Sequence, residues 1–316
     1  MERRPTKNQE AYELYLMGNK CFERWEPEKG FSYYQRAIEL DPQFAEAYLG
    51  LACLYPNYSD EPYGKYFKKY IDKALEINKN LPQAYILIAR HNYAMEWNFP
   101  AAEENFKKAF SLNPGLAEAH IWYSQYLLLM GRYSEAVREI ERARELDPLS
   151  MDMFGQAMTT YIALGEFDKA MEMYRKSQEI NPGSIYPLTH LIRVYYLTGK
   201  YKEALDTSRE WCIKGNTDPK ISMHNGIIYA LSGEREKAKQ IIEALEAENE
   251  YPQRNYGIAL IYASLGDSDK AITWLEKAYK NREFAVVFIK CDPEWNPIRS
   301  DTRYKPLLKK MGLPED

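Results

Sequence analysis

The residues of this chain that most resemble catalytic machinery lie near its C-terminal end, in the stretch CDPEWNPIRSDTRYKPLLKKMGL, residues 291–313. This stretch combines a cysteine, three carboxylates and several lysines and arginines. One hypothesis is therefore a hydrolase whose nucleophile is Cys291, or Cys212 from outside the stretch. A cysteine nucleophile needs a base beside it, and the histidine nearest to the stretch in sequence is His224. We therefore expect the stretch to have a structural role.

Histidines are the other candidates for chemistry. His190 and His224 are 34 residues apart, and two such ligands without a nearby carboxylate or thiol make a weak metal site. The sequence has no Gly-rich phosphate loop, no GxSxG and no HExxH pattern. We predict no catalytic residue, no metal and no cofactor, and we expect that the protein is not an enzyme.

Composition limits the possible partners. The 316 residues include 28% charged and 45% hydrophobic side chains and have a net charge of −4, which does not fit a nucleic-acid-binding surface. Four dispersed cysteines without a CxxC pair fit reduced thiols in a cytoplasmic location. No apolar run is long enough to cross a membrane, and the start MERRPTKNQE has no signal-peptide core.

The elements that would position any binding residues come from an internal repeat. GRYSEAV, GEFDKAM, GKYKEAL and GEREKAK begin at residues 131, 165, 199 and 233, which is a step of 34 residues each time. In one unit, a helix over AEAHIWYSQYLLLM ends at Gly131, and a second helix over SEAVREIERARELD ends at Asp147-Pro148. Ala136 and Ala143 are small residues where the two helices must approach closely.

This residue pattern and its period of 34 resemble the tetratricopeptide repeat (TPR). The resemblance implies an all-α, right-handed superhelix (an α-solenoid) of about eight helix-turn-helix repeats with a C-terminal cap. We expect a lead-in over 1–10, the array over 11–284 and the cap over 285–316. The expected repeats are 11–44, 45–81, 82–116, 117–150, 151–184, 185–218, 219–251 and 252–284.

The cap covers a face that has no following repeat. Residues 284–289, FAVVFI, offer apolar surface, and Trp295 and Tyr304 are expected to pack as anchors. We predict a short last helix that is capped by Asp301 or Thr302, buries Leu307, Leu308 and Met311, and ends at Gly312.

In arrays of this family the first helices form a concave binding face. The resemblance therefore implies a protein or peptide ligand that meets aromatic, amide and cationic side chains of those helices. The residues predicted to bind it are Tyr15, Asn19, Arg90, Tyr93, Trp122, Gln125, Gln156, Thr159, Tyr186, His190, Arg193, Tyr196 and His224, with Tyr12 and Tyr256 beside them. The alternative for many of the tyrosines is packing between repeats. Trp122 could likewise pack between repeats instead of binding a ligand. For the arginines the alternative is an ion pair with Asp or Glu.

Two functions remain open. The leading hypothesis is a non-enzymatic scaffold for protein interactions. The alternative is the regulatory or sensory portion of a larger signalling enzyme or transcription regulator whose catalytic or DNA-binding module is absent from this chain. It rests on a resemblance to the repeats of prokaryotic regulators, in which the array follows a kinase, an adenylate cyclase or a winged-helix module. A clamp for the acidic tail of heat-shock chaperones is not expected. The family forms this clamp from five residues, and only Asn19 matches it here. The other four positions hold Tyr15, Gly50, Gln83 and Leu87, which depart from the pattern.

Overall fold

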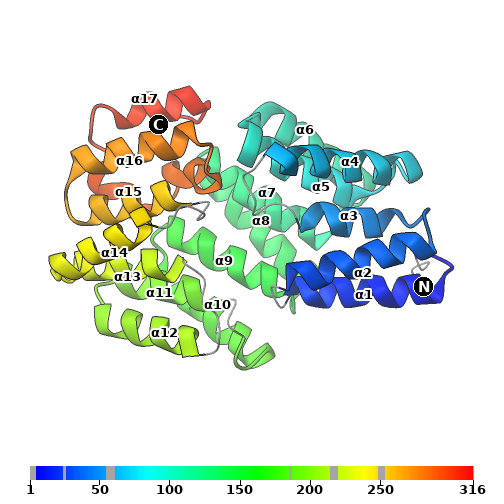
Figure 1. Ribbon diagram of the computed structural model, residues 1–316, viewed down its shortest axis with the longest axis horizontal. Helices are drawn as coiled ribbons and strands as arrows, with labels where there is room; N and C mark the ends of the chain where they lie inside the picture. The colour runs from blue at the N-terminus through cyan, green and yellow to red at the C-terminus, as the bar shows by residue number, and fades with distance from the viewer. Residues whose placement is uncertain are drawn as a thin grey trace. The chain divides into compact units, whose positions relative to one another are not determined.

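The computed structural model describes residues 5–23, 26–54, 61–184, 187–213, 220–247 and 253–315. These residues form helices and turns with no strand, as the repeat pattern predicts (Figure 1). The chain divides into two compact units, one with residues 1–92 and 100–114 and the other with residues 93–99 and 115–316. Each unit is built from consecutive helix pairs.

The first unit contains six helices in its described part. They are α1 (Gln9–Glu23), α2 (Pro27–Leu40), α3 (Ala45–Cys53), α4 (Glu61–Ile77), α5 (Pro82–His91) and α6 (Phe99–Leu112), of which Phe99 itself falls in the second unit. Helices α1 and α2 pack as a pair, as do α3 and α4, and α1 also contacts α3. The ring of Tyr34 on α2 lies between Gly18 and Gly50, where an added Cβ would come within 2.5 and 2.6 Å of it. Small residues at these two places let α1, α2 and α3 approach closely.

The second unit begins with a short π-helical turn, η1 (Asn92–Glu96), whose first residue belongs to the first unit. Five helix pairs follow. They are α7 (Ala117–Leu129) with α8 (Tyr133–Leu146), α9 (Met151–Ala163) with α10 (Phe167–Ile180), α11 (Leu188–Leu197) with α12 (Tyr201–Ile213), α13 (Lys220–Leu231) with α14 (Arg235–Ala247), and α15 (Arg254–Ser264) with α16 (Ser268–Lys280). The first helices also contact one another in succession, from α7 through α9, α11 and α13 to α15.

Local sequence explains the ends of these helices. Gly131 follows α7 with a φ of 71°, a conformation that glycine adopts without a steric penalty. Its N–H donates to Leu128 O and the N–H of Arg132 donates to Leu127 O, which closes the turn as a Schellman motif. Helix α8 ends at Leu146, directly before Asp147-Pro148. The predicted turn and stop are confirmed.

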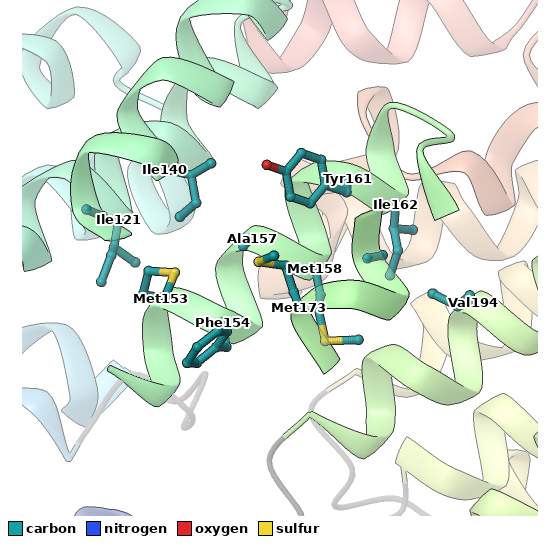
Figure 2. Packing of buried hydrophobic residues seen from close by; sticks show 12 residues of the cluster. Ile121, Ile140, Met153, Phe154, Ala157, Met158, Tyr161, Ile162, Met173 and Val194 are labelled. Carbon is teal, nitrogen blue, oxygen red and sulfur yellow. The ribbon is translucent and has the colours of Figure 1, made fainter. Parts of the chain in front are cut away.

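The core of the second unit runs between the helix pairs (Figure 2). Ile121 of α7, Ile140 of α8 and Met153 of α9 pack in one cluster, which extends to Val194 of α11. Ala136 and Ala143 are fully buried, as expected for close helix approach. Burying one large aliphatic side chain of this kind contributes about 1.5–3 kcal/mol, so this cluster stabilises the packing of the pairs from α7 to α11.

After α16 the chain folds into two 3-10 helices and a short α-helix. These are η2 (Phe284–Lys290), η3 (Pro293–Ile298) and α17 (Tyr304–Met311), which together we call the C-terminal segment. Helix η2 contacts α16 and η3 contacts α15 and α16, so the segment lies against the last helix pair. Trp295, Tyr304, Leu307, Leu308 and Met311 are all buried. The N-cap of α17 is Arg303, not Asp301 or Thr302 as expected, because the turn bond from Tyr304 N–H to Asp301 O delays the helix.

In the described part of the second unit, two non-glycine residues have a positive φ, and they contact each other. These are Trp97, with a φ of 56°, and Arg282, with a φ of 51°. The guanidinium of Arg282 lies 4.7 Å from the centre of the Trp97 ring, and that ring stacks on Tyr279 at 5.1 Å. Arg282 Nη1 also donates to Met95 O at 3.0 Å. These contacts fix the end of α16 against residues 93–99.

Candidate binding surface

Two of the three predicted binding residues of the first unit, Tyr15 and Asn19, take part in packing between its helices. The Tyr15 ring lies 5.1 Å from Phe44 and 5.9 Å from Tyr34. Asn19 Oδ1 accepts a hydrogen bond from Tyr34 Oη at 2.7 Å. Arg90 is half-buried in the last turn of α5. Tyr15 and Asn19 therefore help to join α1 to α2, and ligand binding by all three residues stays a prediction.

In the second unit, three predicted residues form a hydrogen-bonded row across successive helices, which we call the amide row. Tyr93 Oη donates to Gln125 Oε1 at 2.7 Å, and Gln125 Nε2 donates to Gln156 Oε1 at 3.1 Å. These residues come from η1, α7 and α9. Gln156 is only 6% exposed, and its Nε2 has no hydrogen-bond partner among the described residues. The amide row therefore ends in a donor that is buried and unused.

Trp122 and Thr159 lie on the same two helices as the glutamines of the amide row. Trp122 is half-buried and packs against the hydrophobic cluster of Figure 2. Thr159 is half-buried, and its Oγ1 donates to Gly155 O one turn earlier. The packing that was the alternative for Trp122 is thus present, and contact with a ligand stays a prediction for both residues.

Arg193 on α11 binds the C-terminal segment of its own chain. Its Nε donates to Glu294 Oε1 at 2.7 Å and its Nη2 donates to Glu294 Oε2 at 2.9 Å, which is a two-pronged ion pair. Nη2 also donates to Asp292 Oδ1 at 2.9 Å. The side chains of Arg193 and Glu294 are 14% and 4% exposed, so the pair is largely removed from water.

Two tyrosines of first helices complete this contact. Tyr196 Oη on α11 donates to Glu294 Oε1 at 2.7 Å, and Tyr256 Oη on α15 donates to Asp292 Oδ2 at 3.1 Å. Trp295 Nε1 donates in turn to Tyr256 Oη at 3.0 Å, with the two rings edge to face at 5.3 Å. Arg193, Tyr196 and Tyr256, all expected on the binding face, therefore bind the C-terminal segment.

Burial and charge act against each other at this contact. Burial raises the pKa of Asp292 above its usual value; Arg193 opposes this change and Glu294 adds to it. Burial would also raise the pKa of Glu294, but the charge of Arg193 and the hydrogen bonds from Arg193 and Tyr196 offset it and lower that pKa. One guanidinium thus faces two carboxylates. Its stabilisation of the charged form exceeds the effect of burial on the pKa only at Glu294.

Three further predicted residues are His190, His224 and Tyr186. His190 is half-buried on α11, and His224 on α13 is 7% exposed with its ring 6.0 Å from the Tyr196 ring. Tyr186 lies outside the described residues. Within the described part of the chain, no three His, Cys, Asp or Glu side chains gather in a way that could hold a metal. No helix there is long and apolar enough to span a membrane.

Sequence reasoning missed the partners of Arg193. Asp292 and Glu294 were assigned to a cap, and nothing in the 34-residue period relates them to a helix about 100 residues earlier. One signal was present: two carboxylates flank Pro293 between Cys291 and Trp295, both of which are buried. Buried carboxylates are almost always paired, so an acidic turn inside an apolar cap needs a cation from elsewhere.

Comparison with known proteins agrees with this architecture. Two family models described as tetratricopeptide repeat match the chain, one over residues 96–154 and the other over residues 159–184 and 252–283. A search of curated proteins finds no significant match. The chain therefore carries tetratricopeptide repeats, and such repeats are in general non-catalytic scaffolds for protein interaction. The narrower resemblance to prokaryotic regulators stays a prediction.

Solved structures show the same fold. The chain is similar to a chain in the crystal structure of the APC/C hetero-tetramer Cut9-Hcn1, with a TM-score of 0.66 and 14% identity over 95% of this chain and 55% of that one. It is also similar to a tetratricopeptide repeat protein from Parabacteroides merdae ATCC 43184, with a TM-score of 0.54 and 14% identity over 80% and 99% of the two chains. The chain spans about half the length of the first relative. At these identities the likeness concerns the fold alone.

Proposed function

We propose that this protein is a non-enzymatic scaffold that binds an extended segment of a partner protein along the amide row of α7 and α9. The observation that carries the proposal is the row itself, in which Tyr93, Gln125 and Gln156 are linked across η1 and two first helices and end in the unused Gln156 Nε2. A buried donor without a partner costs about 1–3 kcal/mol. A backbone carbonyl of a bound segment would satisfy it once the Gln156 side chain turns out of its covered position.

The chemistry of the row fits a peptide backbone. Gln125 and Thr159 are half-buried, so each keeps some surface for a ligand beside the row. Amide side chains donate to carbonyls and accept from N–H groups, and an extended segment offers both at regular intervals. Trp122 on the same helix adds a flat apolar surface of the type that is enriched at binding hot spots.

The test is partner capture by the full chain and by Gln125→Ala. Proteins retained from the native lysate are compared by mass spectrometry, and thermal unfolding is followed alongside by circular dichroism. If Gln125 contacts the partner, its truncation should weaken capture by about 1–4 kcal/mol, which is the range of interface hot spots. Loss of the same retained protein with the variant still folded supports the proposal.

Gln178→Ala is the matched control. Gln178 is also a half-buried glutamine with two hydrogen bonds, to Ser184 O and from Gly183 N–H, but it lies on the second helix α10. We expect wild-type capture from this variant. Equal capture by the wild type, Gln125→Ala and Gln178→Ala would refute binding at the amide row.

A further inference from the structure

The C-terminal segment contacts the first helices through a short acidic turn, residues 291–295, rather than through apolar surface alone. All four carboxylate oxygens of Asp292 and Glu294 accept hydrogen bonds from side chains of α11 and α15. The donors are Arg193, Tyr196 and Tyr256. A cover for an unpaired apolar face does not need such a set, because apolar contact has no direction.

The arrangement has the features of a recognition site. Arg193 holds Glu294 through two parallel bonds, a geometry that distinguishes a carboxylate from other acceptors. Tyr256 contacts both sides of the turn, because it donates to Asp292 and accepts from Trp295 Nε1. The site therefore recognises two carboxylates and the indole that follows them.

The turn is also joined to the chain by elements that can open. Its first two residues follow the 3-10 helix η2 and its last three form the start of the 3-10 helix η3, and hydrogen bonds in such helices are poorer in geometry than those of an α-helix. Asn296 and Pro297 directly after the turn are exposed. Opening of the turn requires only this short segment to move, and it exposes the buried Trp295.

We infer that Arg193, Tyr196 and Tyr256 form a receptor site for an acidic turn followed by an aromatic residue, that the chain's own residues 291–295 occupy this site, and that a partner segment of the same chemistry binds by displacing them. The inference rests on the proposed function in one respect, namely that first helices bind protein segments. It concerns residues of α11 and α15, whereas the amide row is formed by residues of η1, α7 and α9. A partner segment must then bind the site tightly enough to displace the internal turn, since a tethered ligand competes at a high effective concentration.

The test uses a synthetic peptide that copies residues 289–298 with serine at the position of Cys291. A control peptide has asparagine and glutamine in place of the two acids. Each is titrated by fluorescence polarisation against the full chain and against the full-length variant Asp292→Asn/Glu294→Gln. The variant weakens the internal competitor, so it should bind the acidic peptide at least about tenfold more tightly than the wild type does, which is the scale of a lost charge-assisted pair.

The neutral control peptide should show no such gain, and adding Arg193→Met to the variant should remove the gain. A folded double variant that binds the acidic peptide no better than the wild type overturns the inference, as does equal binding of the two peptides. If circular dichroism shows that the double variant does not fold, the titration is made with Asp292→Asn, which keeps the two-pronged Arg193–Glu294 pair.

Hydrogen exchange of the unmodified chain gives a second readout. Saturating acidic peptide should raise exchange at residues 291–299 while α11 and α15 stay protected; binding without this rise overturns displacement. Gln125→Ala should bind the acidic peptide as the wild type does. Failure of the amide row and failure of this site are therefore distinguishable.

Discussion

Arg193 donates three of the five side-chain hydrogen bonds by which α11 and α15 hold Asp292 and Glu294 of the C-terminal segment. It is the cation that pairs with both Glu294 and Asp292, in a place where water is largely excluded. Removing one partner of a buried ion pair leaves uncompensated charge, which costs far more than the net stability of the pair. This asymmetry predicts a large loss of stability when Arg193 alone is replaced.

Arg193→Met should lower the free energy of unfolding by about 3–5 kcal/mol, because two buried carboxylates lose their cation. Urea unfolding followed by tryptophan fluorescence measures this. The triple variant Arg193→Met/Asp292→Asn/Glu294→Gln should recover much of the loss, since it no longer buries a net charge. Arg303→Met is the control, because Arg303 pairs with Asp269 and Asp301 at an exposed site; an equal loss from Arg303→Met would contradict the argument.

A second prediction at this scale concerns two glycines with the same backbone. Gly131 and Gly165 have φ values of 71° and 72°, so alanine at either should cost about 1–2 kcal/mol. At Gly131 the added Cβ would also lie 3.0 Å from Lys290 Nζ, and Lys290 is buried; at Gly165 nothing lies within 4 Å. Thermal melting should therefore fall further for Gly131→Ala than for Gly165→Ala, and equal shifts would show that Lys290 yields freely.

Among the elements, α15 has a cap that comes from outside the helix. Glu283, 4% exposed, accepts hydrogen bonds from the N–H groups of Asn255 and Tyr256 in the first turn of α15 and from Asn255 Nδ2. Burial raises the pKa of Glu283, although these bonds oppose the change. The return of the chain after α16 thus satisfies donors at the start of α15.

Glu283→Ala should destabilise the protein by about 1–3 kcal/mol, because two buried N–H groups lose their acceptor. Glu283→Gln keeps one acceptor oxygen and should lose less. Chemical unfolding of both variants checks this order. Asp267→Ala removes the ordinary local cap of α16, a bond from Lys270 N–H, and sets the scale at about 1 kcal/mol. A smaller effect of Glu283→Ala than of Asp267→Ala would argue against the cap.

How far the sequence predicts these elements depends on the range of the interactions. The helix pairs, the turn at Gly131, the stop at Asp147 and the buried Ala136 and Ala143 follow from local chemistry and a fixed period, and the structure agrees. The π-helical turn at Asn92–Glu96 has no counterpart in the repeat. The bonds from Arg193 to Glu294 and from Asn255 to Glu283 join residues whose separation no local pattern encodes. The amide row was predicted as a set of single ligand contacts, whereas its members bond to one another.

At the scale of the whole molecule, the C-terminal segment supports the second unit in two ways. It covers α15 and α16, and it supplies the carboxylates that Arg193 needs. Deleting residues 285–316 should therefore cause aggregation or partial unfolding, from exposed apolar surface and from an unpaired buried guanidinium. Size-exclusion chromatography and calorimetry test this. A truncated protein as soluble and as heat-stable as the full chain would remove the structural role of the segment.

Arg193 holds the acidic turn on the first helices of the second unit. Hydrogen–deuterium exchange of the full chain and of Arg193→Met, resolved by peptide, tests it most directly. We expect slow exchange at residues 284–299 in the wild type and a rise confined to these residues and to α11 and α15 in the variant, with α9 and α10 unchanged. Fast exchange at residues 284–299 in the wild type, or no rise there in Arg193→Met, would contradict it.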